Sequence, residues 1–357
     1  MKIIQSINYN IEIGSLLDST LGELLSTTYK NAQKIILVDE NSKAYCLEYL
    51  ITSYDELAYA EVIELPSGEE NKQLDICIQV WESMTEYNMD RSALLINLGG
   101  GVISDMGGLI ASLYKRGISF VNIPTTLLAI VDASVGGKTG VDLGAFKNQI
   151  GLFSFPECIY VDKGFLNTLE KDQINNGIAE MLKHGLIQDR KHWDSIKSLL
   201  MNSGNISDEL IEKSISIKNN IVLIDPYEKS IRKNLNFGHT IGHAIESYFL
   251  EINKPILHGY AVAIGIQIES FISFKMNFLQ SFDFDEIVGV LKCYFPRIEL
   301  PPEAIETIIS NAKQDKKNRG GEIKMVLIKS IGEVVNDISV EEKLIIEGIK
   351  YYIDSKH

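Results

Sequence analysis

Four short apolar runs recur through the first 165 or so residues, and each ends in glycine, in proline with threonine, or in acidic residues. The runs are QKIILVDE (33–40), SALLINLGGG (92–101), GISFVNIPTT (117–126) and PECIYVD (156–162). Runs of this length are typical of parallel strands that are buried on both faces. Segments 69–88 and 104–116, between them, carry apolar residues at helical spacing. This alternation predicts an α/β, Rossmann-like domain with a parallel sheet, whose ligands bind at the carboxyl ends of the strands.

From about Phe165 onward the pattern becomes almost wholly helical. Helical periodicity is found over 174–188, 207–223, 237–251, 258–274 and 339–355. At 357 residues the chain has the length of two domains. We therefore predict an α/β domain over residues 1–165 and an all-α domain over residues 166–357.

Composition and charge exclude several classes of protein. A net charge of −14 argues against a general nucleic-acid binder, because phosphate backbones require a basic surface. No apolar run reaches the roughly 18 to 20 residues of a membrane span, and the N-terminus lacks the apolar core of a signal peptide. The four cysteines, Cys46, Cys77, Cys158 and Cys293, show neither disulfide nor thiolate-zinc spacing. We expect a cytoplasmic protein that contacts neither nucleic acid nor membrane.

A glycine-rich loop, GGGVISDMGG (99–108), leaves one predicted strand and enters a predicted helix. Glycines there let backbone N–H groups approach a pyrophosphate, and the helix N-terminus adds partial positive charge. The loop departs from GxGxxG because Ser104 holds the place of the third glycine, and the candidate ribose-binding acid, Asp39, precedes it. The loop alone leaves a dinucleotide site and a purely structural turn equally open.

A second segment rich in small residues carries positive charge. DASVGGKTG (132–140) contains Lys138, and Lys147-Asn148 follows it closely. Ammonium groups among small residues suit a phosphate or a carboxylate, although a single solvated lysine in a loop is common. The combination favours an anion-binding loop.

Three of the six histidines are grouped in the sequence. His239 and His243 stand four residues apart in NFGHTIGH, which places both rings on one face of a helix, and His258 follows. The glycine before each of the first two leaves the ring open to a ligand. From spacing alone both could bind a metal, with Glu246 as a further candidate, or both could be ordinary core or surface histidines.

Glu180 is an acid in an unusually apolar stretch. It precedes Lys183 by three residues in GIAEMLKHG, so a simple ion pair is one interpretation. The other is a metal ligand, because one glutamate with two distant histidines is a known zinc set. His184, His192 and His357 we interpret as structural or surface residues.

Taken in order, the motifs GGGVISDMGG, PTTLLAIVDASVGGKTGV, KN, GIAEMLKHG, NFGHTIGHAIE, LHG and DKKNRGG resemble the 3-dehydroquinate synthase family. The resemblance runs from about Asp39 to Glu333. It implies an N-terminal NAD-binding domain, residues 1–165, and a C-terminal metal- and substrate-binding domain, residues 166–357. It also implies NAD and Zn2+ or Co2+ as cofactors, and a homodimer.

The resemblance also assigns residues. Glu180, His239 and His258 match the metal ligands, and His243 matches a catalytic histidine beside them. For NAD the matching residues are Asp39, Glu69, Lys72, Gly100, Gly101, Val102, Asp105, Thr125, Thr126, Lys138, Lys147, Phe165, Thr168 and Leu169. For the substrate they are Arg116, Asp132, Lys138, Lys147, Asn148, Lys183, Lys218, Arg232, Asn236 and one of Lys316 and Lys317.

The implied substrate is 3-deoxy-D-arabino-heptulosonate 7-phosphate, a phosphorylated sugar acid, and the implied products are 3-dehydroquinate and phosphate. In this reaction NAD+ accepts a hydride from the substrate and is regenerated when NADH returns it within the same cycle, before and after a phosphate elimination, and an aldol closure follows. We expect His243 to transfer protons, Asn236 and Lys183 to contact ring hydroxyls or carboxylate, and Arg116 and Lys138 to bind phosphate or carboxylate.

One departure and three alternatives remain. The family commonly reads HGE after the ligand histidine, whereas this chain has Tyr260 in place of the acid, so the orientation of the histidine needs another source. Another sugar phosphate cyclase, such as a 2-deoxy-scyllo-inosose or valiolone synthase, would share the cofactors. A metal-dependent alcohol or polyol dehydrogenase would consume NAD stoichiometrically. A non-catalytic binding protein would have lost ligands, and none is missing.

Overall fold

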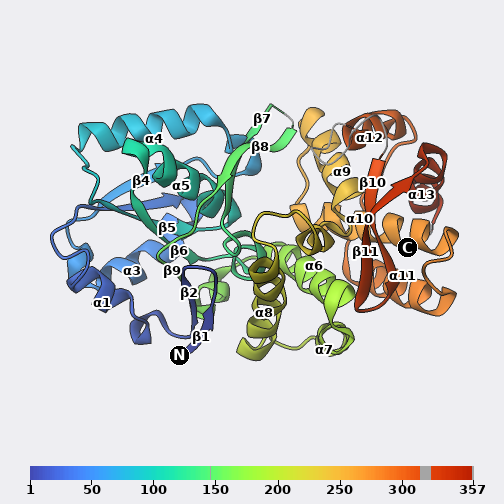
Figure 1. The fold of residues 1–357 in the computed structure, drawn as a ribbon, viewed down its shortest axis with the longest axis horizontal. Helices are drawn as coiled ribbons and strands as arrows, with labels where there is room; N and C mark the ends of the chain where they lie inside the picture. The colour runs from blue at the N-terminus through green and yellow to red at the C-terminus, as the bar shows by residue number, and fades with distance from the viewer. Residues whose placement is uncertain (145, 314–322, 356–357) are drawn as a thin grey trace. The chain divides into compact units, whose positions relative to one another are not determined.

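The computed structural model describes residues 1–144, 146–313 and 323–355. They form two compact units, Met1–Ile174 and Asn175–His357, each of which is considered by itself (Figure 1). The change of unit falls within helix α6 (Lys171–Gln188). We predicted that residues 1–165 bind NAD and that residues 166–357 bind metal and substrate. The division into two units does not test this, so it stays a prediction.

The first unit is built on a seven-stranded sheet with the order β1-β2-β9-β6-β5-β3-β4. Its strands are β1 (Lys2–Gln5), β2 (Asn10–Ile13), β3 (Lys34–Asp39), β4 (Glu61–Leu65), β5 (Leu94–Gly99), β6 (Ser119–Pro124) and β9 (Cys158–Val161). Only β1 and β2 pair antiparallel; the other pairs are parallel. The four strands predicted from apolar runs are confirmed as β3, β5, β6 and β9.

Both faces of this sheet are covered, because side chains alternate along each strand. Ile35 and Leu37 of β3 belong to the apolar cluster under α4 and α5, whereas Ile36 and Val38 belong to the cluster under α1 and α3. Figure 1 shows these two pairs of helices on opposite sides of the sheet. The helices of the unit are α1 (Leu21–Ser26), α2 (Glu40–Ser42), α3 (Glu48–Ser53), α4 (Leu74–Glu86) and α5 (Gly101–Leu113). Each fully buried aliphatic side chain stabilises the fold by about 1.5–3 kcal/mol.

The segment predicted to be an anion-binding loop folds as a helical turn followed by a two-stranded ribbon, and its role in anion binding stays a prediction. Strands β7 (Lys138–Leu143) and β8 (Phe146–Phe153) pair antiparallel. A Cβ on Gly151 would lie 2.3 Å from the carbonyl oxygen of Thr139, so glycine is needed where the two strands approach closely. The glycines and lysines of this segment therefore belong to a β-hairpin, which the sequence analysis did not predict.

The second unit is predominantly helical, as predicted. Its helices are α6, α7 (Arg190–Met201), α8 (Asp208–Ile224), α9 (His239–Glu251), α10 (His258–Lys275), α11 (Ser281–Tyr294), α12 (Ala304–Lys313) and α13 (Glu342–Asp354). The short helical turns of the two units are η1 (Leu16–Asp18), η2 (Lys43–Leu47), η3 (Asp55–Leu57), η4 (Glu69–Asn71), η5 (Tyr114–Arg116), η6 (Ala129–Ala133) and η7 (Lys163–Thr168) in the first, and η8 (Ile231–Asn236) in the second. No helix within the described residues has the length and apolar character needed to cross a membrane.

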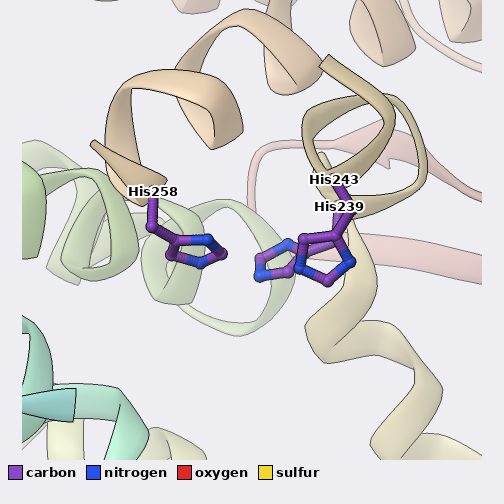
Figure 2. Close-up of side chains that lie close together, drawn as sticks. All are labelled: His239, His243 and His258. Carbon is purple, nitrogen blue, oxygen red and sulfur yellow. The ribbon is translucent and has the colours of Figure 1, made fainter. Parts of the chain in front are cut away.

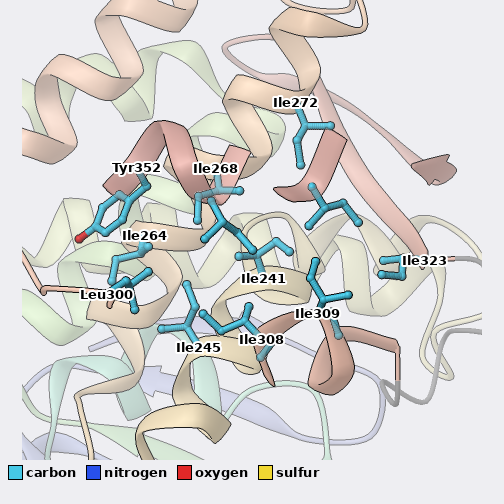
Figure 3. Close-up of a cluster of buried hydrophobic side chains, with 14 of the residues drawn as sticks. Ile241, Ile245, Ile264, Ile268, Ile272, Leu300, Ile308, Ile309, Ile323 and Tyr352 are labelled. Atoms are coloured by element: carbon cyan, nitrogen blue, oxygen red, sulfur yellow. The ribbon is translucent and has the colours of Figure 1, made fainter. Parts of the chain in front are cut away.

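The prediction of an all-α second domain missed one antiparallel hairpin, β10 (Ile323–Ser330) with β11 (Glu333–Val340). Ile323, Met325 and Leu327 alternate along β10, and all three join the buried cluster formed by α9, α10, α12 and α13 (Figure 3). Val326 and Ile328 are buried as well, so residues 325–328 form a short apolar run, which periodicity alone does not distinguish from a buried helix. The hairpin thus completes the core against which α9 and α10 pack.

Candidate functional site

Three histidines meet in the second unit, at the start of two helices. His239 is the first residue of α9 and His258 is the first residue of α10, and His243 follows His239 by one turn. The ring centroids are 5.0 Å apart for His239 and His243, 5.4 Å for His239 and His258, and 5.6 Å for His243 and His258. The rings from α9 and the ring from α10 point toward one another (Figure 2). One ligand atom of each lies within 4.8 Å of the others.

The carboxylate of Glu180 lies against two of these rings. Glu180 comes from α6 and is fully buried, and its Oε1 lies 3.5 Å from Nε2 of both His239 and His258. Its Oε2 forms an ion pair with Lys183. A tetrahedral zinc ion with bonds of about 2.1 Å sets its ligand atoms about 3.4 Å apart. Glu180, His239 and His258 therefore offer three donor atoms of types that a divalent metal ion binds, and both distances from Glu180 to the rings match this spacing.

The other ring nitrogen of each of these two histidines contacts an acceptor. Nδ1 of His239 lies 3.1 Å from the carbonyl oxygen of Phe237, and Nδ1 of His258 lies 3.1 Å from Oε2 of Glu246. A carbonyl or carboxylate only accepts, so Nδ1 carries the hydrogen and Nε2 faces Glu180. Burial disfavours the charged ring of His258, but Glu246 and Glu180 outweigh it and raise the pKa of His258 to about 10.

Neighbouring helices cap the starts of α9 and α10. Their own N-cap residues, Gly238 and Leu257, provide no side-chain hydrogen bond. Glu269 of α10 instead accepts from the backbone N–H groups of Gly238 (2.6 Å) and Ile241 (3.1 Å). Asn176 of α6 accepts from the N–H of Gly259 at 2.6 Å. Helix starts need such acceptors, and here the acceptors bond to the backbone beside His239 and His258.

The glycines beside the histidines have a different role from the one expected. A Cβ on Gly238 would lie 2.4 Å from Cγ1 of Ile266, and a Cβ on Gly242 would lie 3.1 Å from the carbonyl oxygen of Ala261. Both glycines therefore allow α9 to pack closely against α10. The expectation that they open the rings to a ligand is replaced by this packing role.

The segment that leads into α9 is folded around Asp225, which the sequence analysis missed. The carboxylate of Asp225 accepts from the N–H groups of Lys229 (2.9 Å), Ser230 (2.6 Å) and Arg232 (3.1 Å). Burial raises the pKa of Asp225, but these hydrogen bonds outweigh it and hold it below its ordinary value. The sequence signal for this acid was its place shortly before the basic residues Lys229, Arg232 and Lys233.

Two substrate candidates lie in this segment. The Asn236 amide donates to Oε1 of Glu228 at 2.7 Å, and Glu228 has a left-handed backbone with φ of 57°. Arg232 is 1% exposed and donates to the carbonyl oxygen of Pro226. Glu228 is a second acid that the sequence analysis missed, and no motif in the sequence marked it.

Lys183 and Lys218 are buried on α6 and α8, at 1% and 7% exposure. His184 and His192 are also buried, and both contact the hydroxyl of Ser214, at 3.3 Å and 2.9 Å. Burial, followed by the neighbouring His184, lowers the pKa of His192 to about 4. A neutral His192 hydrogen-bonded in the core agrees with its interpretation as a structural residue.

In the first unit, the carboxyl ends of neighbouring strands bring several NAD candidates together. Asp39 ends β3 and forms a capping box with Ser42, and Gly100 is the N-cap of α5. The N–H of Thr125, just after β6, donates to the carbonyl oxygen of Gly99 at 2.9 Å. The remaining candidates here follow the same edge: Gly101 and Val102 begin α5, Thr126 follows Thr125, and Phe165, Thr168 and Leu169 lie in or just after η7. This is the edge where ligands bind in α/β sheets.

Five more predicted residues form one charged network beside the β7–β8 ribbon. Lys72 donates to Asp105 (2.7 Å) and to Asn148 (2.8 Å), and Lys147 pairs with Glu69. Burial opposes the charge of Lys72, but Asp105 and Glu69 outweigh it and raise its pKa above the ordinary value.

Asp142, a residue that the sequence analysis missed, lies within this network. It is 1% exposed and accepts from the N–H of Asn148 at 2.6 Å. Burial raises the pKa of Asp142, although Lys147 and Lys72 lower it. An acid inside an apolar strand was the available signal for this residue.

The remaining predicted residues of the first unit are Arg116, Lys138 and Asp132. Arg116 is exposed and follows the far end of α5, about 20 Å along the helix from Gly101. Lys138 is exposed at the start of β7, and Asp132 is partly buried in η6. Lys316 and Lys317 lie outside the described residues.

Comparison with known proteins gives matches over nearly the whole chain. The profile for the N-terminal part of 3-dehydroquinate synthase matches residues 62–176, and that for the C-terminal part matches residues 177–318. The chain is 40% identical to the 3-dehydroquinate synthase of Parabacteroides distasonis over 341 residues, which cover 95% of this chain and 96% of that protein.

Two solved structures share the fold. A 2-deoxy-scyllo-inosose synthase complexed with carbaglucose-6-phosphate, NAD+ and Co2+ aligns with a TM-score of 0.84 at 24% identity, covering 98% of this chain and 99% of that chain. A 2-epi-5-epi-valiolone synthase from Streptomyces hygroscopicus with NAD+ and Zn2+ bound aligns with a TM-score of 0.83 at 25% identity, covering 99% of this chain and 98% of that chain.

Proposed function

Because the chain belongs to the 3-dehydroquinate synthase family, we propose that it converts 3-deoxy-D-arabino-heptulosonate 7-phosphate to 3-dehydroquinate and phosphate. One observation carries the proposal beyond family membership. A buried carboxylate oxygen of Glu180 lies 3.5 Å from Nε2 of both His239 and His258, which is the donor set of a catalytic metal site. When bound, NAD+ supplies a reversible hydride acceptor, and a divalent metal ion holds substrate hydroxyls and lowers their pKa.

The second unit is proposed to hold the metal and the substrate. Glu180, His239 and His258 are the proposed ligands for Zn2+ or Co2+, and His243 is the proposed proton-transfer group. His243 is suited to this role because its ring lies edge-on to His239, within reach of a group held beside the proposed metal ligands. The buried cations Lys183 and Arg232 suit a substrate that carries a carboxylate and a phosphate, because ammonium and guanidinium groups form strong charged hydrogen bonds with such anions.

The first unit is proposed to hold NAD. Gly100, Gly101 and the start of α5 offer backbone N–H groups to the pyrophosphate, and Asp39 offers a carboxylate to a ribose. The other proposed NAD contacts are Glu69, Lys72, Val102, Asp105, Thr125, Thr126, Lys138, Lys147, Phe165, Thr168 and Leu169. Besides Lys183 and Arg232, the proposed substrate contacts in both units are Arg116, Asp132, Lys138, Lys147, Asn148, Lys218, Asn236 and one of Lys316 and Lys317.

The deciding experiment supplies the heptulosonate phosphate with only trace NAD+ and follows phosphate release and dehydroquinate absorbance. We expect many product molecules per NAD+, because the hydride returns within each cycle. Net NADH accumulation would indicate a dehydrogenase instead, and a metal-loaded protein without turnover would reject the proposal. The matched control omits the substrate's phosphate, which removes the leaving group and must abolish product formation.

A second candidate function is supported by the TM-score of 0.84 with the 2-deoxy-scyllo-inosose synthase. That enzyme was solved with carbaglucose-6-phosphate, so the same assay with glucose 6-phosphate tests this candidate. We expect no phosphate release from glucose 6-phosphate, which lacks the carboxylate. Phosphate release from it alone would establish the second candidate.

A homodimer and a cytoplasmic location are likewise proposals, and family membership is their only support. Sedimentation equilibrium of the purified chain tests the first: a mass twice that of the 39.9 kDa chain supports a dimer, and a single-chain mass excludes it.

A further inference from the structure

The ring of His258 is held between two carboxylates, one at each nitrogen. Oε1 of Glu180 lies 3.5 Å from Nε2, and Oε2 of Glu246 lies 3.1 Å from Nδ1. Glu246 is only 6% exposed and the His258 side chain is 23% exposed, so the second contact is partly buried, with its carboxylate on the buried side. A charged hydrogen bond in such surroundings is stronger than one at the surface.

Glu246 comes from the same helix as the facing ligand. It follows His239 by seven residues in α9, so both lie on one face of that helix, two turns apart. Helix α9 thus presents one proposed ligand and also contacts the ring of the other, which α10 presents. The orientation of His258 is therefore set from outside its own helix.

Tyr260, two residues after His258, does not take this place. Its side chain is 8% exposed, and its ring packs edge-on against Phe295, with the centroids 5.9 Å apart. A phenol packed into an aromatic pair offers no carboxylate to a histidine. The carboxylate at Nδ1 of His258 comes from Glu246.

We propose that Glu246 is a positioning residue of the metal site, which orients His258 and keeps the hydrogen on its Nδ1 so that Nε2 is presented to the metal. This inference rests on the proposed metal-binding function of Glu180, His239 and His258. Partners of this kind also make the coordinating nitrogen more basic, and their loss typically lowers metal affinity about 10- to 100-fold.

The test measures Zn2+ or Co2+ affinity by competition with a coloured chelator, together with the visible spectrum of the Co2+ form. Glu246→Gln keeps the size of the side chain and removes its charge, and we expect about a tenfold loss of affinity. Glu246→Ala removes the contact altogether, and we expect a loss nearer 100-fold. Glu251→Gln makes the same chemical change at an exposed position of the same helix and must retain the parent affinity.

A double-variant cycle separates positioning from general packing. In a His258→Ala background Glu246 has no ring to orient, so adding Glu246→Gln must cause no further loss of metal affinity. Independent, additive losses would overturn the proposal, and so would parent-like affinity in both Glu246 variants. Because the readout is metal affinity, it judges Glu246 separately from the synthase assay, whose failure would overturn the proposed activity.

If Glu246→Gln does not fold, the parent protein provides the measurement. Nitrogen-15 spectra of the histidine rings with Zn2+ bound report which nitrogen carries hydrogen. We expect His258 to show Nδ1–H and a metal-bound Nε2. A hydrogen on Nε2 of His258 would overturn the proposal.

Discussion

At the residue scale, the three histidines of the cluster differ in what lies behind each ring. Phe237 offers a carbonyl oxygen to His239 and Glu246 offers a carboxylate to His258, at 3.1 Å in both cases. Both contacts leave Nε2 of these rings directed at Glu180. The third ring, His243, faces His239 at an interplanar angle of 81°. The contacts of His239 and His258 with Glu180 support the proposal that these two histidines are the metal ligands.

The division of roles predicts opposite phenotypes for two alanine variants. His239→Ala removes one of three proposed ligands, so we expect loss of bound zinc. His243→Ala should retain zinc and lose about 10²- to 10⁴-fold in rate, the usual contribution of a positioned acid–base group. Metal content per chain and kcat check both. Equal metal content and equal activity in the two variants would contradict the assignment.

His192 predicts a pH dependence of stability. Its pKa is lowered to about 4 by burial and by His184, so as pH falls the unfolded chain takes up the proton first. The stabilisation is complete above about pH 6.5 and is lost as the pH falls toward 4; the full difference corresponds to about 3 kcal/mol.

The check is urea unfolding between pH 7.5 and 4.5, for the parent and for His192→Gln. Glutamine does not titrate and can still hydrogen-bond Ser214, which contacts His192 at 2.9 Å. The free energy of unfolding should fall less steeply with decreasing pH in the variant. Identical slopes in both proteins would refute the role of His192.

At the element scale, the spacing of apolar residues predicted most of the buried strands and long helices. The apolar strands β3, β5, β6 and β9 and the long helices α6, α8, α9, α10 and α13 lie where the sequence placed them, to within a few residues. Strand β4 was missed because it is a short edge strand with alternating exposure. Helix α7, which only Asp189 separates from α6, was not predicted as an element of its own.

The candidate site was predictable by residue type but not by arrangement. Glu180 and the histidines were chosen from spacing and family resemblance. The groups that hold them in place come from residues that are distant in the sequence. Asn176 caps a helix that starts 82 residues later, and Glu269 caps one that starts 30 residues earlier. No periodicity within one element reports such pairs, because they exist only after α6, α9 and α10 have packed.

The packing of α9 against α10 predicts a contrast between two glycine variants. A Cβ on Gly265 would lie 1.9 Å from the carbonyl oxygen of Gly238, so Gly265→Ala must push the helices apart. We expect a loss of about 1–3 kcal/mol in the free energy of unfolding and weaker metal binding. Chemical denaturation and metal competition measure these effects.

Gly289 in α11 is the matched control. A Cβ there meets no atom within 4 Å, so the same substitution adds no clash. Gly289→Ala should leave metal binding unchanged and raise stability by about 0.4–1 kcal/mol, because alanine restricts the unfolded chain. Equal effects at both positions would show that helix spacing does not matter to the site.

At the scale of the whole molecule, each unit has its own buried core. The clusters on the two faces of the sheet draw only on residues of the first unit, and the cluster around α9 and α10 draws only on the second. A ligand stabilises the part of a protein that binds it, by about 2.7 kcal/mol at a concentration 100 times its Kd. Two cofactors bound in different units should therefore stabilise them separately.

Hydrogen exchange followed by mass spectrometry checks this separation. We expect Zn2+ to slow exchange in α6, α9 and α10, and NAD+ to slow it at the start of α5 and along the neighbouring strand ends. The Glu180→Gln variant should lose the zinc effect and keep the NAD+ effect. Zinc protection confined to residues 1–174 would contradict the placement of the metal.

The capping of α9 and α10 by neighbouring helices limits how the site can be transplanted. A peptide copied from α9 alone would contain His239 and His243, yet it would lack the carboxylate that caps its first turn. The proposed ligands, their caps and Glu246 all lie between Asn176 and Glu269. A designer who moves this metal site into another scaffold must therefore take residues 176–269 as one cassette, since a shorter graft separates a histidine from the group that aims it.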